Sequence, residues 1–254
     1  MINRPAVFML WLREMKRFSR SKSRIIGSLI MPLFFLGFLG LGFNRMAVPG
    51  VAPGVDYLKF LVPGIIGMTL LFSSTMQGLS VLWDREFGFL KEIMVAPVSR
   101  LSIVLGRLAG GVTTSLIQAL LILAISIVLG FRVRGWTDLV VALAFMLLIS
   151  FTFIGLGLIF ASRMRDIQGF GLVMNFIIFP LFFLSGAFYP LSNLPWFVRS
   201  LSYVDPLTYG IDGLRGAMIR SSTHSLVFNL AVLAGFAFLM TSLGAFFFEK
   251  SESV

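Results

Sequence analysis

Few side chains in this sequence have the chemistry of a catalyst. Cysteine is absent and His224 is the only histidine, which excludes a thiol nucleophile, a disulfide and a thiolate metal site. None of the five lysines follows a glycine, so the chain lacks the G-x-x-x-x-G-K-[ST] loop that cradles nucleotide phosphates. The H-E-x-x-H and G-x-S-x-G motifs of hydrolases are absent as well. We therefore expect no enzyme, and no metal or cofactor bound by this chain.

Charged residues gather instead in segment 84–107. Apolar side chains recur there at helical spacing and Pro97 then ends the pattern; they are Phe87, Leu90, Ile93 and Met94. A solvated loop has no need of such an apolar face. The pattern therefore predicts a cytoplasmic helix parallel to the membrane that offers a surface to a partner, with a simple interfacial helix as the alternative.

The elements that position this segment are those of an integral membrane protein. Hydrophobic residues make up 57% of the 254 residues, and the mean hydropathy is +0.95. About 20 apolar residues cross the roughly 30 Å of hydrocarbon in a bilayer. Charge-free runs therefore predict an all-α single domain over residues 1–254 with six spanning helices, in 25–43, 60–83, 108–131, 139–162, 167–198 and 226–248.

The run 167–198 is too long for one crossing. Its 32 residues carry no charge, and Pro180, Gly186, Pro190 and Pro195 interrupt it. Non-helical backbone at membrane depth must be covered by protein or face water. We expect one crossing followed by a re-entrant outer segment, 188–216, and a translocation path near the break.

Basic residues indicate the orientation. Of the 21 lysines and arginines, 14 lie in alternate segments that include both termini. Such an excess marks the cytoplasmic side, so both termini are predicted to be cytoplasmic and the net charge of +10 does not indicate nucleic-acid binding. Segment 5–24 is predicted to form an amphipathic helix on the membrane lipid, because apolar residues recur there at helical spacing; they are Phe8, Trp11, Leu12, Met15 and Phe18.

The predicted spans contain polar and aromatic side chains but no Asp, Glu, Lys, Arg or His. Ion-coupled transporters usually need ionisable groups there, so the energy for any transport is expected from outside the bundle. Polar residues in the spans are expected mainly to tie helices together. The phenylalanines Phe176, Phe179, Phe182 and Phe183 form a wall for an amphipathic substrate or, alternatively, a lipid-facing surface.

Two stretches resemble ABC-2 type transporter permeases. Residues 85–100, REFGFLKEIMVAPVSR, are similar to the coupling-helix region of that family, which shows an E-x-G-x-L…P-x-S-R pattern. Residues 183–190, FLSGAFYP, with Leu194-Pro195 and the DPLTY sequence at 205–209, are similar to its fifth span and re-entrant outer helices. Arg107 stands where many relatives carry lysine, which preserves the charge. The resemblance covers essentially the whole chain.

This resemblance, strongest to the daunorubicin-resistance type of exporter, implies a permease of the plasma membrane. The permease pairs with a second copy of itself or a similar permease, and with a separate ABC ATP-binding subunit that holds ATP and magnesium. Contacts with that subunit are expected at Glu86, Gly88, Leu90, Lys91, Ile93, Pro97, Ser99 and Arg100. The substrate path is expected at Phe176, Phe179, Phe183, Gly186, Tyr189 and Pro190.

Several functions remain open at this point. Outward transport of a hydrophobic or amphipathic compound, as in multidrug or lipid export, is favoured. Export of a lipid-linked polysaccharide would use a similar core. From other classes, an ion-coupled secondary transporter and a purely structural membrane protein are the alternatives, and the partner-facing segment 84–107 argues against the latter.

Overall fold

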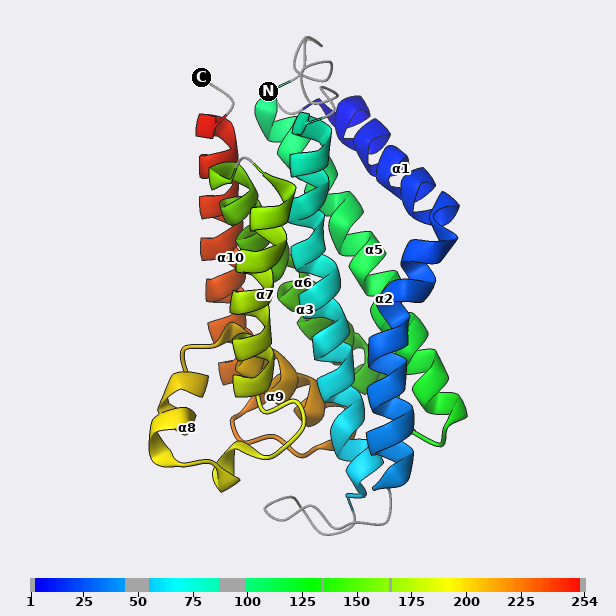
Figure 1. The fold of residues 1–254 in the computed structure, drawn as a ribbon. Coiled ribbons are helices and arrows are strands. Elements are labelled where there is room, and N and C mark those ends of the chain that lie inside the picture. The colour runs from blue at the N-terminus through cyan, green and yellow to red at the C-terminus, as the bar shows by residue number, and fades with distance from the viewer. Residues whose placement is uncertain (1–2, 44–54, 87–98, 134, 165, 252–254) are drawn as a thin grey trace.

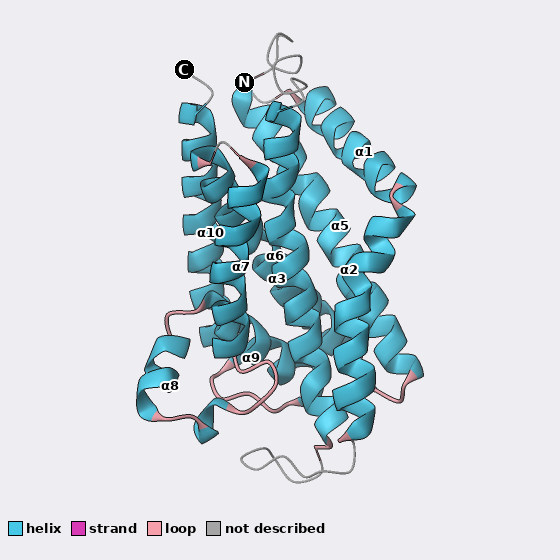
Figure 2. Cartoon of the chain, in the orientation of Figure 1, coloured by secondary structure: helices cyan, strands magenta, loops and turns pink. Residues whose placement is uncertain are grey.

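The structure is a computed structural model that describes residues 3–43, 55–86, 99–133, 135–164 and 166–251. Helices joined by loops and turns make up these residues, as the sequence predicts (Figure 2). Both termini lie at the same end of the helix bundle, which we call the terminal end (Figure 1). The short helix α9 lies at the opposite end, which we call the α9 end (Figure 1).

The chain begins with two helices that meet at an elbow. Helix α1 (Arg4–Arg20) starts at Asn3, whose side chain accepts a hydrogen bond from the Ala6 amide. Helix α2 (Lys22–Phe35) follows and continues into a π-helical stretch (Leu36–Leu41). The direction of the chain changes by 68° between α1 and the α2 segment. Helix α1 falls within the predicted segment 5–24, and its place on the lipid stays a prediction.

Five longer helices are apolar enough to cross a membrane. A helix of 18 residues is about 27 Å long and one of 30 residues about 45 Å, which brackets the thickness of the hydrocarbon. The bent pair formed by α1 and α2 provides a sixth candidate if it is counted as one span. The five are α3 (Tyr57–Glu86), α5 (Arg100–Val128), α6 (Trp136–Arg163), α7 (Ile167–Leu184) and α10 (Leu226–Ser251).

The break that the sequence predicts within the run 167–198 is present. Helix α7 ends at Leu184, and Gly186 follows with a φ of 72°, a backbone conformation that glycine adopts without strain. The chain then forms a 3₁₀ turn (Leu191–Asn193), α8 (Trp196–Ser202) and α9 (Pro206–Ile219). Helix α9 is buried from Pro206 to Met218 and packs on α3, α6 and α10. The chain therefore folds back into the bundle before α10 begins.

Helix α6 forms the centre of the bundle. It packs against α3, α5, α9 and α10. A side chain added at Gly157 on α6 would lie 2.7 Å from the carbonyl oxygen of Thr75, so glycine allows the backbones of α6 and α3 to approach closely. In contrast, α2, α7 and α10 expose many large apolar side chains to their surroundings, as expected of helices that face lipid or a partner.

Candidate functional site

A cavity of about 380 Å³ opens beside the elbow between α1 and α2. Helices α3 and α5 form its back wall, and Phe179 of α7 lies at its deep end next to Phe72 of α3. This volume falls in the range of small-molecule sites, about 300 to 1,000 Å³. Its apolar walls and the buried polar atoms of its lining residues make this cavity the leading candidate for ligand binding.

Two kinds of surface line the cavity. Apolar walls come from α2, α3 and α7, with Met31, Pro32, Met68, Phe72 and Phe179 as the main contributors. A row of polar side chains follows one face of α3, because residues three or four apart share a helix face; the row is Thr69, Ser73, Gln77 and Ser80. Next to it, α5 contributes Thr114 and Gln118, and Thr114 accepts a hydrogen bond from Gln77. The cavity therefore suits a molecule with an apolar part and a polar part.

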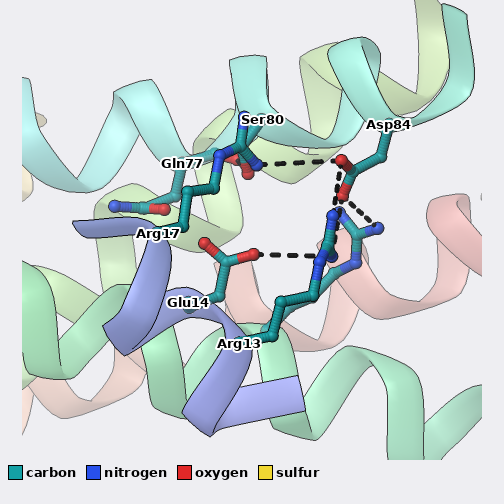
Figure 3. Close-up of polar contacts among 7 residues, drawn as sticks. Arg13, Glu14, Arg17, Gln77, Ser80 and Asp84 are labelled. Atoms are coloured by element: carbon teal, nitrogen blue, oxygen red, sulfur yellow. Dashed lines mark hydrogen bonds and ion pairs between the residues drawn. The ribbon is translucent and has the colours of Figure 1, made fainter. Parts of the chain in front are cut away.

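At its terminal end the cavity meets a cluster of five charged residues: Arg13, Glu14, Arg17, Asp84 and Arg107. Asp84 lies at its centre (Figure 3). The Asp84 carboxylate accepts hydrogen bonds from Arg13 at 2.9 and 3.2 Å and from Arg107 at 2.9 Å. Arg17 lies 3.7 Å from the same carboxylate. This charged cluster joins three helices, α1, α3 and α5, and it includes Asp84 and Arg107, the first and last residues of the predicted segment 84–107.

Arg17 and Glu14 of the charged cluster also line the cavity (Figure 3). Arg17 Nη1 and Glu14 Oε1 are buried and have no hydrogen-bond partner among the described residues. The nearest cation to that Glu14 oxygen is Arg13, at 3.7 Å, too far for a hydrogen bond. The two side chains thus present unused hydrogen-bonding capacity at the polar end of the cavity.

Glycines on α5 determine how closely α1 approaches. Gly106 and Gly110 form a G-x-x-x-G pattern, which lets two helices touch. A side chain at Gly110 would lie 2.7 Å from the Glu14 Cβ, and one at Gly106 would lie 2.7 Å from the Leu10 Cβ. Trp11 also donates a hydrogen bond to Thr113 of α5 at 3.1 Å. This close packing places Glu14 at the cavity.

Polar residues in the predicted spans connect α3 to α5. Ser73 and Ser74 both bond the Ser115 hydroxyl, at 3.0 and 3.1 Å, and Gln77 donates to Thr114 at 3.0 Å. These contacts agree with the expectation that polar side chains in the spans tie helices together. Ser73 and Gln77 additionally line the cavity, so the same side chains hold its back wall in place.

Aromatic side chains fill the space between the cavity and the turn after α7. Phe72 contacts Phe179 and Phe182, with ring centroids 5.6 and 6.1 Å apart. Phe182 in turn lies 4.9 Å from Phe188, which lies 4.8 Å from Phe35 of α2. These five residues form an aromatic cluster, which we call the aromatic barrier, that extends from the cavity-lining Phe72 and Phe179 to Phe188 in the turn after α7.

The turn after α7 is held to α9 by a buried arginine. Arg215 donates hydrogen bonds to the carbonyl oxygens of Gly186 and Ala187 at 2.8 and 3.0 Å. Its guanidinium also lies 3.7 Å from the centre of the Phe60 ring. Arg215 therefore fixes the turn that the sequence predicts to lie on the translocation path.

Asp205 caps α9 by accepting a hydrogen bond from the Leu207 amide, and burial raises the pKa of its carboxyl to about 8.

The expected substrate-path residues fall in three different places. Phe179 lines the cavity, whereas Phe176 is 86% exposed on the outside of α7. Phe183 is partly exposed beside the aromatic barrier. The others lie in the turn: Gly186, Tyr189, whose hydroxyl donates to the Phe183 carbonyl, and Pro190, which lines a smaller pocket at the α9 end.

The expected coupling residues lie mostly outside the described residues, as Gly88, Leu90, Lys91, Ile93 and Pro97 do. At the borders of that gap, Glu86 ends α3 and Arg100 begins α5. Ser99 caps α5, since its hydroxyl accepts from the Ser102 amide. The coupling role of all these residues stays a prediction.

Sequence reasoning did not place Glu14, Arg17, Asp84 and Arg107 in one site. A signal was present, because Glu14 is the only acidic residue in a helix whose other charged residues are all basic. Among the residues that the structure describes, no group of three His, Cys, Asp or Glu side chains could hold a metal ion.

Comparison with known proteins agrees with this architecture. The sequence profile of the ABC-2 type transporter family matches residues 5–219. The inner membrane transport permease YadH of Escherichia coli is 32% identical over 232 residues, covering 89% of this chain and 88% of YadH. Nodulation protein J of Sinorhizobium fredii is 26% identical, over 90% of this chain and 87% of its own length.

A third relative also carries the name of a transport permease. The putative transport permease ycf38 of Cyanophora paradoxa is 29% identical, over 85% of this chain and 75% of its own length. The profile match extends over the elbow, the charged cluster and the segment that folds back before α10. The chain therefore belongs to the ABC-2 type transporter family and is a multi-pass membrane transport permease, the membrane subunit of an ABC transporter.

Proposed function

We propose that this permease moves a hydrophobic or amphipathic compound outward across the plasma membrane, driven by a separate ABC ATP-binding subunit. The observation that carries the proposal is the position of the cavity. It opens beside the elbow, and its polar end meets a charged cluster whose central residue, Asp84, lies two residues before Glu86. A movement of the coupling segment 84–107 would therefore reach the cavity through Asp84.

The proposed orientation places the terminal end in the cytoplasm. Basic residues of α1 then face the inner leaflet, where anionic lipid attracts them. Six crossings result when α2 with its π-helical extension is counted as the first. In this orientation substrate enters from the inner leaflet beside the elbow and leaves towards the α9 end. The re-entrant segment 188–216 forms the outer boundary of that route.

Transport requires the aromatic barrier to open. The barrier lies between the deep end of the cavity and the turn that Arg215 holds. Closure of the ATP-binding subunits would push on segment 84–107, turn α1 through the charged cluster and shift α2 and α3 relative to α7. Phe35 and Phe72 belong to the moving helices, whereas Phe179 and Phe182 belong to α7, so this shift would part the rings.

A second permease chain belongs to the proposed assembly. Helix α7 exposes Leu172, Phe176 and Phe183, and it makes few contacts with the rest of the bundle. A second copy of this chain, or a similar permease, would cover this face close to the cavity. Each permease would then receive one ATP-binding subunit at its coupling segment.

The experiment that tests the function is reconstitution after affinity purification from the native membrane. An ATP-binding subunit should co-purify in about equal amount, and the complex in vesicles should move amphipathic compounds only when ATP is supplied. Asp84→Asn should reduce this transport, because removing one partner of a buried ion pair costs about 3 kcal/mol. Asp56→Asn is the matched control, since Asp56 is exposed and pairs only with Lys59 among the described ion pairs.

Other outcomes would separate the alternatives. Transport that follows an ion gradient without any ATP-binding subunit would support a secondary transporter and contradict the proposal. Export of a lipid-linked polysaccharide by the ATP-driven complex would keep the motor and change the cargo. Equal losses in Asp84→Asn and Asp56→Asn would mean that the charged cluster has no special part in coupling.

A further inference from the structure

We propose that the cavity selects amphiphiles whose head group carries both an anion and N–H or O–H donors, such as a phosphoethanolamine head. This inference rests on the proposed function, because it names the substrate class of the same cavity. The partner of the anion is Arg17, and the partners of the donors are Glu14 and Gln118. The apolar part of the ligand lies along α2, α3 and α7.

Unpartnered buried atoms converge on this cavity. Glu14 Oε1, Arg17 Nη1 and Gln118 Oε1 all belong to lining residues, and each is buried without a hydrogen-bond partner among the described residues. Glu14 is 8% exposed and Gln118 is 5% exposed. A buried polar atom left unbonded costs about 1 to 3 kcal/mol, and more when it is charged. A ligand that satisfies these atoms recovers that free energy.

The two oxygens call for donors. Gln118 presents its amide oxygen from α5 and Glu14 presents its carboxylate oxygen from α1, and both residues line the same cavity. Arg13, the cation closest to Glu14, already bonds Asp84 through two of its nitrogens. An ammonium or hydroxyl group in the cavity would supply the hydrogen bonds that neither oxygen finds within the described residues.

The guanidinium calls for an anion. Asp84 is the carboxylate nearest to Arg17, but its two oxygens already accept bonds from Arg13 and Arg107. Arg17 remains 3.7 Å away and also lies beside Trp83, 5.6 Å from the ring centre. Arginine favours phosphate and carboxylate because its planar fork matches two of their oxygens. Hence an anionic group complements the charge that Asp84 only partly balances.

The depth of the cavity fits the rest of an amphiphile. Met31, Pro32 and Met68 flank the route from the polar end to Phe72 and Phe179. Methionine adapts its shape to different apolar groups, which suits a chain or a flat ring. On the surface next to the cavity, Lys16 and Arg20 extend the basic face of α1 and border the same Arg17.

The test compares four single-chain amphiphiles that share one acyl chain and differ in the head group. The heads are phosphoethanolamine, phosphocholine, phosphate and a primary amine. Phosphocholine carries both charges but no N–H donor, phosphate lacks the cation, and the amine lacks the anion. Native mass spectrometry of the full chain in detergent measures the relative affinities, and a thermal melt of each variant verifies that it is folded.

We expect the phosphoethanolamine amphiphile to bind about tenfold more tightly than each of the other three, a difference that corresponds to about 1.4 kcal/mol. Arg17→Gln should remove its advantage over the amine. Glu14→Leu should remove its advantage over the phosphocholine amphiphile, because leucine has no oxygen to accept the N–H bonds. Gln118→Leu should also weaken binding of the phosphoethanolamine amphiphile. The substitution breaks no hydrogen bond at Gln118 Oε1, because that atom has no partner among the described residues. Arg20→Gln is the control, because Arg20 lies on α1 outside the cavity.

Equal affinity for the four heads would overturn the inference, as would an equal effect of Arg17→Gln and Arg20→Gln. If ATP-driven transport persisted in that case, the proposed function would stand and only the head-group preference would fall. If the head-group preference were found in a chain that has no ATP-binding partner, the cavity assignment would stand and the proposed function would fall.

Discussion

Side chains of the charged cluster differ in whether they reach the cavity. Asp84 and Arg107 are both about 6% exposed, and a direct hydrogen bond of 2.9 Å joins them. A charge so far removed from water is tolerated only when it is paired and bonded. Glu14 Oε1 and Arg17 Nη1 have no hydrogen-bond partner among the described residues and belong to residues that line the cavity. The unpartnered Nε and Nη1 of Arg107 belong to a residue outside that lining, so Glu14 and Arg17 are the members of the cluster available to a ligand in the cavity.

Asp205 leads to a prediction about pH. Burial raises the pKa of this carboxyl to about 8 from an ordinary value of 3.8, so between these values the folded chain holds a proton that the unfolded chain lacks. Stability from this group is therefore largest at low pH and falls as the pH rises towards 8, by up to about 1.4 kcal/mol per pH unit. Tyr209, beside it, stays neutral in this range because its own pKa is raised, mainly by burial.

Melting curves between pH 5 and pH 9 provide the measurement. Asp205→Asn keeps the side-chain oxygen that accepts the Leu207 amide but cannot release a proton. The original chain should lose stability relative to this variant from pH 5 to about pH 8 and stay level above it. If the stability of the two proteins changed with pH in parallel, the Asp205 carboxyl would titrate below pH 5, which would contradict the prediction.

At the scale of elements, the sequence predicts helices better than it predicts their contacts. Charge-free runs predict the five long helices because a spanning helix needs only length and apolarity, and α3, α6 and α10 contain their predicted runs entirely. The amphipathic pattern of 5–24 likewise predicts a helix where α1 is found. The sequence does not predict the docking of α1 on α5, because this contact joins two segments almost 100 residues apart. Within either segment, only the glycine pair on α5 indicates a close helix contact.

That docking can be tested with one methyl group. Gly110→Ala would place a Cβ 2.7 Å from the Cβ of Glu14, so α1 must move away from α5. Alanine usually stabilises a helix relative to glycine by about 1 kcal/mol, yet here we expect a lower melting temperature and weaker transport. Gly235→Ala on α10 is the control, because nothing lies within 4 Å of its added Cβ. A melting temperature that rose equally in both variants would contradict the packing described for α1.

At the scale of the whole molecule, the sequence indicates where the chain folds back but not where the cavity lies. The interrupted run 167–198 predicts the return of the chain, and the structure shows α8 and α9 there. Of the six residues expected on the substrate path, however, only Phe179 lines the cavity. The reason is physical: a cavity forms where helices fail to pack, and the bend between α1 and α2 creates that gap. Periodicity within one segment carries no information about such a bend.

The absence of cysteine in the sequence makes the orientation of the molecule directly measurable. Arg4 is an exposed residue in the first turn of α1, which begins at the terminal end (Figure 1), and Ser192 is an exposed residue in the turn at the α9 end. If the terminal end is cytoplasmic, Ser192→Cys should react with a membrane-impermeant maleimide in intact cells. Arg4→Cys should react only after the membrane is opened. The opposite result would invert the proposed direction of transport, because the cavity would then open to the outer leaflet. Labelling of both cysteines in intact cells would contradict the placement of the two sites at opposite ends of a membrane-spanning bundle.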